Sequence, residues 1–275
     1  MTIRGVLAIV VVLSAARQGL GLDITACNTL VPDNEVGVLQ TDMSCGGAFI
    51  AVGLGENSTL DMNGHSITGT FPTGRAVECR GIRCTILSSN GTGRIGGGDF
   101  DAVQIGFFTS NVARLRISDV DLHDARGGLH GSGNVLFERD TRVVAQRVAA
   151  HGNADFGIWV TRFTGAHIDA SHNGVVGVSA DKLRGTTITT SSNGASGLFG
   201  DRISAKGLIS NDNGVAGVRA VSASLKNATI TGNNGFGMGI DVATLNRPHA
   251  HNVTCGKSQV LAAVAGANWG ICTGD

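Results

Sequence analysis

Acidic, histidine and arginine side chains occur in three short segments that are far apart in the sequence. Asp119, Asp121 and His123 alternate with the apolar residues Val120 and Leu122. Because residues two apart share one side of a strand, these polar side chains are expected to face outward together. Two later segments carry residues of the same kind, namely Arg147 with His151 and His167 with Asp169.

These side chains suit reactions on sugars. Two carboxyl groups at a suitable separation act as acid and base, or as acid and nucleophile, on a glycosidic bond. Carboxylates can instead hold Ca²⁺ against an acidic sugar, with Arg147 or a histidine as base or charge clamp. The competing interpretation is a solvated polar face whose opposite charges pair weakly. The chemistry requires a fold that places the three segments side by side.

A repeat of twenty residues indicates such a fold. An asparagine recurs every twenty residues. A glycine comes four residues after each of these asparagines, and an apolar residue comes five residues before each of them. The asparagines are Asn153, Asn173, Asn193, Asn213 and Asn233. The preceding apolar residues are Val148, Ile168, Ile188, Leu208 and Ala228. Three earlier segments, 74–77, 101–103 and 127–129, resemble the same strand start at intervals of about 26 residues.

The repeat predicts an all-β fold. Short stretches that alternate apolar and polar residues are broken by Asn-Gly and Gly, which is typical of strands and turns. Helical repeats need more than about 30 residues per unit. We therefore predict a single-domain parallel β-helix of roughly ten to eleven coils, in which equivalent residues stack about 4.8 Å apart. The asparagines should adopt a left-handed turn conformation and form a hydrogen-bonded ladder, while the glycines relieve crowding at the bends.

Composition and charge narrow the class of partner. The 275 residues include 42 glycines, only 4% are aromatic and 15% are charged. Such a chain suits a thin core of small aliphatic side chains with many tight turns. The formal net charge is zero and no run of Lys or Arg stands out, whereas nucleic-acid binding requires a basic face. The sequence therefore argues against a nucleic-acid partner.

The first residues have the pattern of a secretory signal peptide. Arg4 is followed by an apolar stretch at 6–13 and by the small residues Ser14, Ala15 and Ala16. The apolar stretch is too short to span a membrane, which requires about 20 residues. We expect cleavage after Ala16, with a site near Gly21 as the alternative, and a secreted, periplasmic or cell-surface protein without a transmembrane segment.

Six cysteines remain after the expected cleavage site. An even number in an exported chain implies disulfides, although six cysteines allow 15 pairings. Proximity in the sequence favours Cys27–Cys45, Cys79–Cys84 and Cys255–Cys272. A metal site is the competing explanation, but none of the spacings is that of a zinc site.

The early coil and the later rungs resemble a known superfamily. The segment 60–69 reads Leu-Asp-Met-Asn-Gly-His-Ser-Ile-Thr-Gly, and it follows Cys27 and Cys45. With the later Asn-Gly-x-x-Gly rungs, this pattern is similar to that of right-handed parallel β-helix proteins of the pectate-lyase-like superfamily. The resemblance implies a right-handed helix over residues 59–250, an N-terminal cap and first coil over 23–58, and a C-terminal cap over 251–275. It is weak for activity, because this superfamily includes lyases, hydrolases, epimerases and proteins with no known reaction.

Two functional hypotheses follow from these observations. In the first, the protein binds a polysaccharide or cell-surface glycan on its outer strand face, with a lyase, hydrolase or epimerase activity at the charged residues. Trp159 and Phe199 would then be platforms on which sugar rings stack. In the second, the protein is a non-catalytic structural or adhesive solenoid. The sequence identifies neither the glycan nor the oligomeric state.

Overall fold

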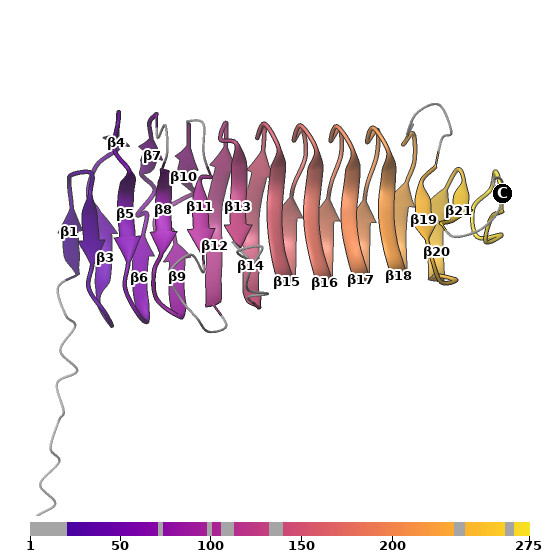
Figure 1. Cartoon of the computed structure of the whole chain (residues 1–275), viewed down its shortest axis with the longest axis horizontal. Coiled ribbons are helices and arrows are strands. Elements are labelled where there is room, and N and C mark those ends of the chain that lie inside the picture. The colour runs from indigo at the N-terminus through magenta and orange to yellow at the C-terminus, as the bar shows by residue number, and fades with distance from the viewer. Residues whose placement is uncertain are drawn as a thin grey trace, which may run out of the picture.

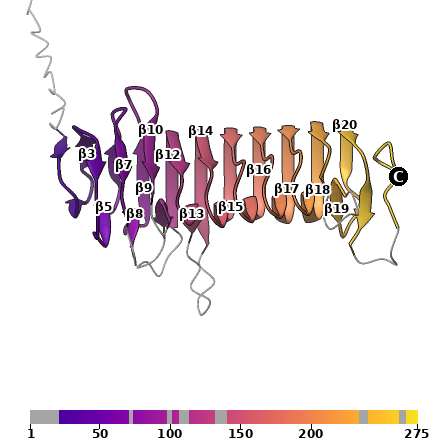
Figure 2. The same cartoon turned by 90° about the horizontal axis from the view of Figure 1, so that it is seen from above.

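The chain forms an all-β right-handed parallel solenoid. The computed structural model describes residues 21–70, 74–97, 101–105, 113–131, 140–233, 240–261 and 267–275. The expected signal peptide, residues 1–16, lies outside these residues, as does the last predicted rung around Gly237. Strands stack along one long axis from β1 to the C-terminal end, and no helix occurs in the described part of the chain (Figures 1 and 2).

The strands lie on three faces of the solenoid, which we call sheets I, II and III. Sheet I contains β2 (Thr29–Val31), β5 (Ile50–Leu54), β8 (Arg75–Cys79), β11 (Val103–Ile105), β13 (Gly127–Gly131), β19 (Val242–Thr244) and β21 (Ser258–Val260). Sheet II contains β1 (Leu22–Ile24), β3 (Val36–Leu39), β6 (Ser58–Asp61) and β9 (Arg83–Leu87). Sheet III contains β4 (Met43–Ser44), β7 (Ser66–Thr68) and β10 (Gly93–Gly96).

Seven longer strands pass from one sheet to the next. β12 (Ala113–His123), β14 (Thr141–His151) and β20 (His249–Cys255) run from sheet II into sheet III. β15 (Phe156–Asp169), β16 (Val176–Thr189), β17 (Ser196–Ile209) and β18 (Ala216–Ile230) each pass through all three sheets. The solenoid has about eight regular turns, slightly fewer than the ten or eleven that the sequence indicated, since the strands at both ends are short.

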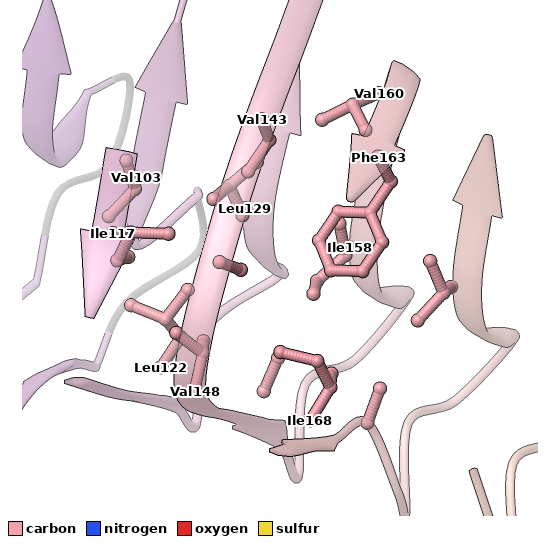
Figure 3. Close-up of a cluster of buried hydrophobic side chains, with 14 of the residues drawn as sticks. Val103, Ile117, Leu122, Leu129, Val143, Val148, Ile158, Val160, Phe163 and Ile168 are labelled. Carbon is pink, nitrogen blue, oxygen red and sulfur yellow. The ribbon is translucent and has the colours of Figure 1, made fainter. Parts of the chain in front are cut away.

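The predicted stacking of the apolar column is confirmed. Val120 pairs with Val148, Val148 with Ile168, Ile168 with Ile188, and Ile188 with Leu208. All five side chains are buried in one continuous core. Figure 3 shows Leu122, Val148 and Ile168 pointing into this interior. Residues twenty apart are therefore neighbours along the axis from β14 to β17.

The predicted asparagine ladder is also present, but its conformation differs from our expectation. The Nδ2 of Asn173 donates to Oδ1 of Asn193 at 3.1 Å, and Asn193 donates in turn to Asn213 at 2.9 Å. The left-handed residue is the one before each asparagine, for example His172 with φ 58° and Ser192 with φ 57°. Each buried asparagine amide is thus held by the next rung, while an exposed neighbour makes the turn.

The ladder ends on a buried carboxylate. Oδ1 of Asp241 accepts hydrogen bonds from the backbone N–H of Asn233 at 3.2 Å and from its Nδ2 at 2.8 Å. Asp241 therefore takes the place that a further asparagine would occupy.

The glycine column is needed for close packing, as predicted. A Cβ built on Gly177 would lie 2.6 Å from the carbonyl oxygen of Ala170 and 2.7 Å from that of Gly197. Both oxygens belong to the backbone and cannot move aside cheaply. Any larger residue would force adjacent coils apart.

All three predicted disulfides are formed. Cys27–Cys45 ties the N-terminal strands, Cys79–Cys84 closes a tight corner after β8, and Cys255–Cys272 holds the segment after β20. Each constrains the unfolded chain and contributes about 2–4 kcal/mol of stability.

Removing one ladder rung should destabilise the whole solenoid. We expect Asn193→Ala to lower the free energy of unfolding by about 3 kcal/mol, because it leaves buried donors and an acceptor of the adjacent rungs without partners. Urea denaturation followed by circular dichroism measures this change. Asn246→Ala, at an exposed asparagine, is the control and should change the midpoint little. Equal midpoints for the two variants would show that the ladder is not stabilising.

Candidate functional site

The three predicted charged segments lie side by side where sheet II bends into sheet III. His123 pairs in register with His151, and Asp121 and Asp169 flank Ala149 on opposite sides. Asp119, Arg147 and His167 lie at the bend itself, where their φ angles are 59°, 52° and 56°. They therefore occupy an edge between two sheets, and not the flat strand face that the alternating pattern predicted.

Asp119 and Arg147 form a two-pronged ion pair across adjacent coils. Nε of Arg147 lies 2.5 Å from Oδ1 of Asp119, and Nη2 lies 2.8 Å from Oδ2. The hydrogen bond from Arg147 lowers the pKa of Asp119, and the carboxylate raises the pKa of Arg147. At neutral pH both groups stay charged and neutralise each other, so neither is well placed to exchange protons with a ligand.

Two histidines and two carboxylates, His123, His151, Asp121 and Asp124, lie beside this ion pair. Together with Asp119, Arg147, His167 and Asp169 they form what we call the charged patch. Nε2 of His151 lies 3.0 Å from Oδ1 of Asp121, and Nδ1 of His123 lies 2.9 Å from Oδ2 of Asp124. The two imidazole rings are stacked, with their centroids 6.1 Å apart. The His123 ring is oriented by its hydrogen bond with Asp124, whereas His151 is only within ion-pair distance of Asp121. Paired imidazole and carboxylate groups of this kind can take part in proton transfer.

His167 and Asp169 lie on the far side of a shallow hollow of about 360 Å³, which Arg147 also lines. Oδ1 of Asp169 accepts a hydrogen bond from the Ser171 hydroxyl at 2.6 Å. The backbones of Asp121 and Asp169 are two strand spacings apart, or about 10 Å. The carboxyl groups of inverting glycosidases are about 6.5–9.5 Å apart, and those of retaining enzymes about 5–5.5 Å.

The described residues include no group of three or more His, Cys, Asp or Glu side chains that is arranged to hold a metal ion. Within the part of the chain that the structure covers, no helix could cross a membrane.

Trp159 and Phe199 lie on a different sheet from the charged patch. Both are on the outer face of sheet I, in the same column, with Ser179 on the strand between them. The predicted outward orientation is confirmed, since both rings are about half exposed. The two sets of predicted site residues are therefore not brought together into one site.

The sequence analysis missed a row of basic residues on sheet II, which we call the basic row. One cation stands on each successive strand from β9 to β17, in the order Arg83, Arg114, Arg142, Arg162, Lys182 and Arg202. The paired positions of sheet II on these described strands and β18 carry no carboxylate, but the exposed Asp181 and Asp201 directly precede Lys182 and Arg202 in β16 and β17. Four further cations lie on the same face, namely Arg116, Arg184, Lys206 and Lys226.

The zero net charge and the lack of a Lys or Arg run gave no indication of this basic face. A neutral composition hid the charge separation, and no two members of the basic row are close in sequence. The twenty-residue repeat could have revealed the basic row, because Arg142, Arg162, Lys182 and Arg202 are each twenty residues apart.

Two hollows open on this basic face. The larger, about 560 Å³, runs over β15 to β18 and β20 and is lined by Arg162, Lys182, Arg184 and Arg202 with several serines. The smaller, about 350 Å³, is lined by Arg83, Arg114 and Arg116. Between them, Asp140 pairs with both Arg142 and Arg162, at 2.8 and 3.0 Å.

No protein-family model matches the chain, and no curated protein or solved structure matches it either. Function is therefore inferred from the chemistry of the protein's own surfaces.

Breaking the bend ion pair should raise the pKa of Asp119. In Arg147→Gln we expect this pKa to return towards the ordinary value of about 3.9. The lowered pKa means that Asp119 contributes stability above its unfolded-state pKa and loses that contribution as the pH falls through its folded-state pKa. An NMR titration of the side-chain carboxyl carbon measures the shift. Arg219→Gln, on sheet I, is the control, and an unchanged titration of Asp119 in Arg147→Gln would contradict the pairing.

Proposed function

We propose that the protein is exported and binds a linear anionic polysaccharide, which lies along the solenoid axis on the basic face of sheet II. The observation that supports this most is the basic row, with one cation on each of six successive strands. Its spacing of about 4.8 Å per strand is close to the length of one sugar residue. A polymer with regularly spaced negative charges can therefore meet a cation at each rung.

The composition of the basic face favours a glycan over nucleic acid. Its outward positions from β9 to β18 are basic, hydroxyl-bearing or aliphatic, with one glutamine, and none of these described positions is aromatic. Single-stranded nucleic acids depend on aromatic side chains for base stacking. Serine and threonine hydroxyls next to arginines suit the hydroxyl and carboxylate groups of an acidic sugar.

Export is supported by the N-terminal sequence pattern, and the three disulfides are compatible with an extracellular protein. The sequence of the early coil, residues 60–69, and the later Asn-Gly-x-x-Gly repeats favour a relationship to the pectate-lyase-like superfamily. This relationship is part of the proposal. The charged patch borders sheet II at the bend, and it remains our candidate for a lyase, hydrolase or epimerase reaction. The alternative is a solenoid that binds without modifying its ligand.

Binding should depend on both salt and the basic row. We expect the protein to bind polygalacturonate, alginate or heparin at low ionic strength and to lose affinity as salt rises, because cations in the row displace counterions from the polymer. Arg162→Gln, Lys182→Gln and Arg202→Gln combined should weaken binding at least about tenfold. Isothermal titration calorimetry measures both effects.

A charge-matched variant serves as the control. Arg94, Arg247 and Lys257 are exposed cations that lie off sheet II, and replacing all three by Gln should leave most of the affinity intact. Equal losses in the two triple variants would contradict the assigned face. Tighter binding of an oligonucleotide than of any acidic glycan at the same salt concentration would contradict the ligand class.

Any bond cleavage or epimerisation should require the charged patch. Asp121→Ala and His151→Ala are expected to abolish it while leaving the fold and the polyanion affinity unchanged. A panel of acidic and neutral glycans, incubated with and without Ca²⁺ and analysed by chromatography and NMR, detects both reactions. Full activity in both variants would exclude the patch as the reaction site, and no reaction on any glycan would favour the non-catalytic alternative.

A further inference from the structure

The outer face of sheet I carries a second ordered row of side chains, which we call the aromatic row. His130, Trp159, Ser179, Phe199 and Arg219 lie on successive strands in register. This row is on a different sheet from the basic row and from the charged patch. Its five members include two exposed aromatic side chains and no carboxylate, so it differs in chemistry from the basic row, which has no aromatic member, and from the charged patch, which contains carboxylates.

Two aromatic platforms in this row are separated by one small residue. Trp159 is 50% exposed and Phe199 is 45% exposed, although both are large apolar side chains. Ser179 between them is only 7% exposed. Two strand spacings separate the platforms, which places them about 10 Å apart along the axis. In an extended β-1,4-linked glycan, alternate sugar residues present the same face at a similar repeat.

Trp159 is held in place by its neighbours. The ring of Phe156 packs edge-on against Trp159, with the centroids 5.4 Å apart, and edge-on against His130 at 5.3 Å. Phe156 is itself buried, so its contacts restrain both rings. A platform held in this way loses little side-chain freedom when a sugar stacks on it.

Polar groups stand at both ends of the aromatic row. Nδ1 of His130 lies 2.7 Å from Oδ2 of Asp101. With Nδ1–H donated to that carboxylate, Nε2 of His130 is the nitrogen that can accept a hydrogen bond from a hydroxyl group. At the other end, the guanidinium of Arg219 lies 5.8 Å from the centre of the Phe199 ring and offers donors. Aromatic faces flanked by such groups match the apolar faces and hydroxyl edges of a pyranose chain.

We propose that the aromatic row is a second glycan-binding site, which takes a neutral β-1,4-linked chain of at least three or four sugar residues. Trp159 and Phe199 stack against alternate rings, and His130, positioned by Asp101, hydrogen-bonds a hydroxyl group. This site does not depend on the basic row. A single molecule would thereby hold an acidic glycan on sheet II and a neutral glycan on sheet I, and so join two polymers.

Tryptophan fluorescence tests this site directly. The chain has two tryptophans, so a Trp269→Phe background reports on Trp159 alone. Cellohexaose, chitohexaose, xylohexaose and mannohexaose are the probes. We expect at least one hexasaccharide to shift the Trp159 emission, to bind more tightly than its disaccharide, and to do so equally at low and high salt. Calorimetry on Phe199→Ala and Trp159→Ala in the wild-type background should show a loss of affinity of about tenfold or more for each.

Matched variants separate this site from the others. Ile209→Ala removes an apolar side chain of similar exposure from sheet III and should leave neutral-glycan binding unchanged. The Gln triple variant of the basic row should also retain it, while Trp159→Ala should retain polyanion binding. If none of the four hexasaccharides binds, or if binding survives the double variant Trp159→Ala/Phe199→Ala, the proposal is wrong. If sedimentation shows a dimer that the double variant dissociates, the aromatic row is an interface between two copies and the glycan assignment is also wrong.

Discussion

The hydrogen bonding between successive coils at a fixed offset is the constraint on which every surface of this protein depends. From β15 to β18 that offset is twenty residues, and it pairs inward residues with inward residues and outward with outward. Because successive strand residues point to opposite sides, a slip of one residue would exchange the core for the surface. The buried ladder of asparagines opposes such a slip, since every amide would lose its partner on the next rung.

This constraint converts sequence periodicity into rows of identical chemistry. A charge that recurs every twenty residues becomes a continuous basic row, and two aromatic residues forty apart, Trp159 and Phe199, become platforms on β15 and β17 with one strand between them. The protein has no net charge, yet sheet II concentrates cations along one face, where Asp140 pairs with two of them. The distribution of charged side chains along the solenoid axis, and not the overall composition, therefore determines which ligands the surface can attract.

Much of the fold was predictable because its determinants are local and repeated. The asparagine and glycine columns, the inward apolar column and the three disulfide pairs all follow from short spacings. The bend at Asp119, Arg147 and His167 interrupts the alternation, because two outward residues stand next to each other there and the inward positions pass from Ile117 to Val120 in β12. The left-handed residue turns the strand into the next sheet and shifts the inward positions by one residue.

The candidate surfaces were harder to predict, for three different reasons. The basic row was missed because its members are at least twenty residues apart in the sequence. Only the stacking of successive coils makes them neighbours. Asp101 and His130 are 29 residues apart, before the twenty-residue repeat begins, so the repeat could not predict their pairing. The charged patch was assembled correctly from its residues, but the bend allows Asp119 and Arg147 to neutralise each other. The sequence pattern did not show that these two charges neutralise each other.

Cysteine cross-linking tests the central claim of register most directly. Cα atoms more than about 7 Å apart cannot be bridged by a disulfide without moving the backbone. Lys182 and Arg202 are direct neighbours on β16 and β17, whereas Ser204 is two residues further along. The account predicts that Lys182→Cys/Arg202→Cys oxidises readily to an intramolecular disulfide in the folded protein, while Lys182→Cys/Ser204→Cys does so poorly. The opposite preference, or no difference between the two pairs, would contradict the twenty-residue register and the surfaces that depend on it.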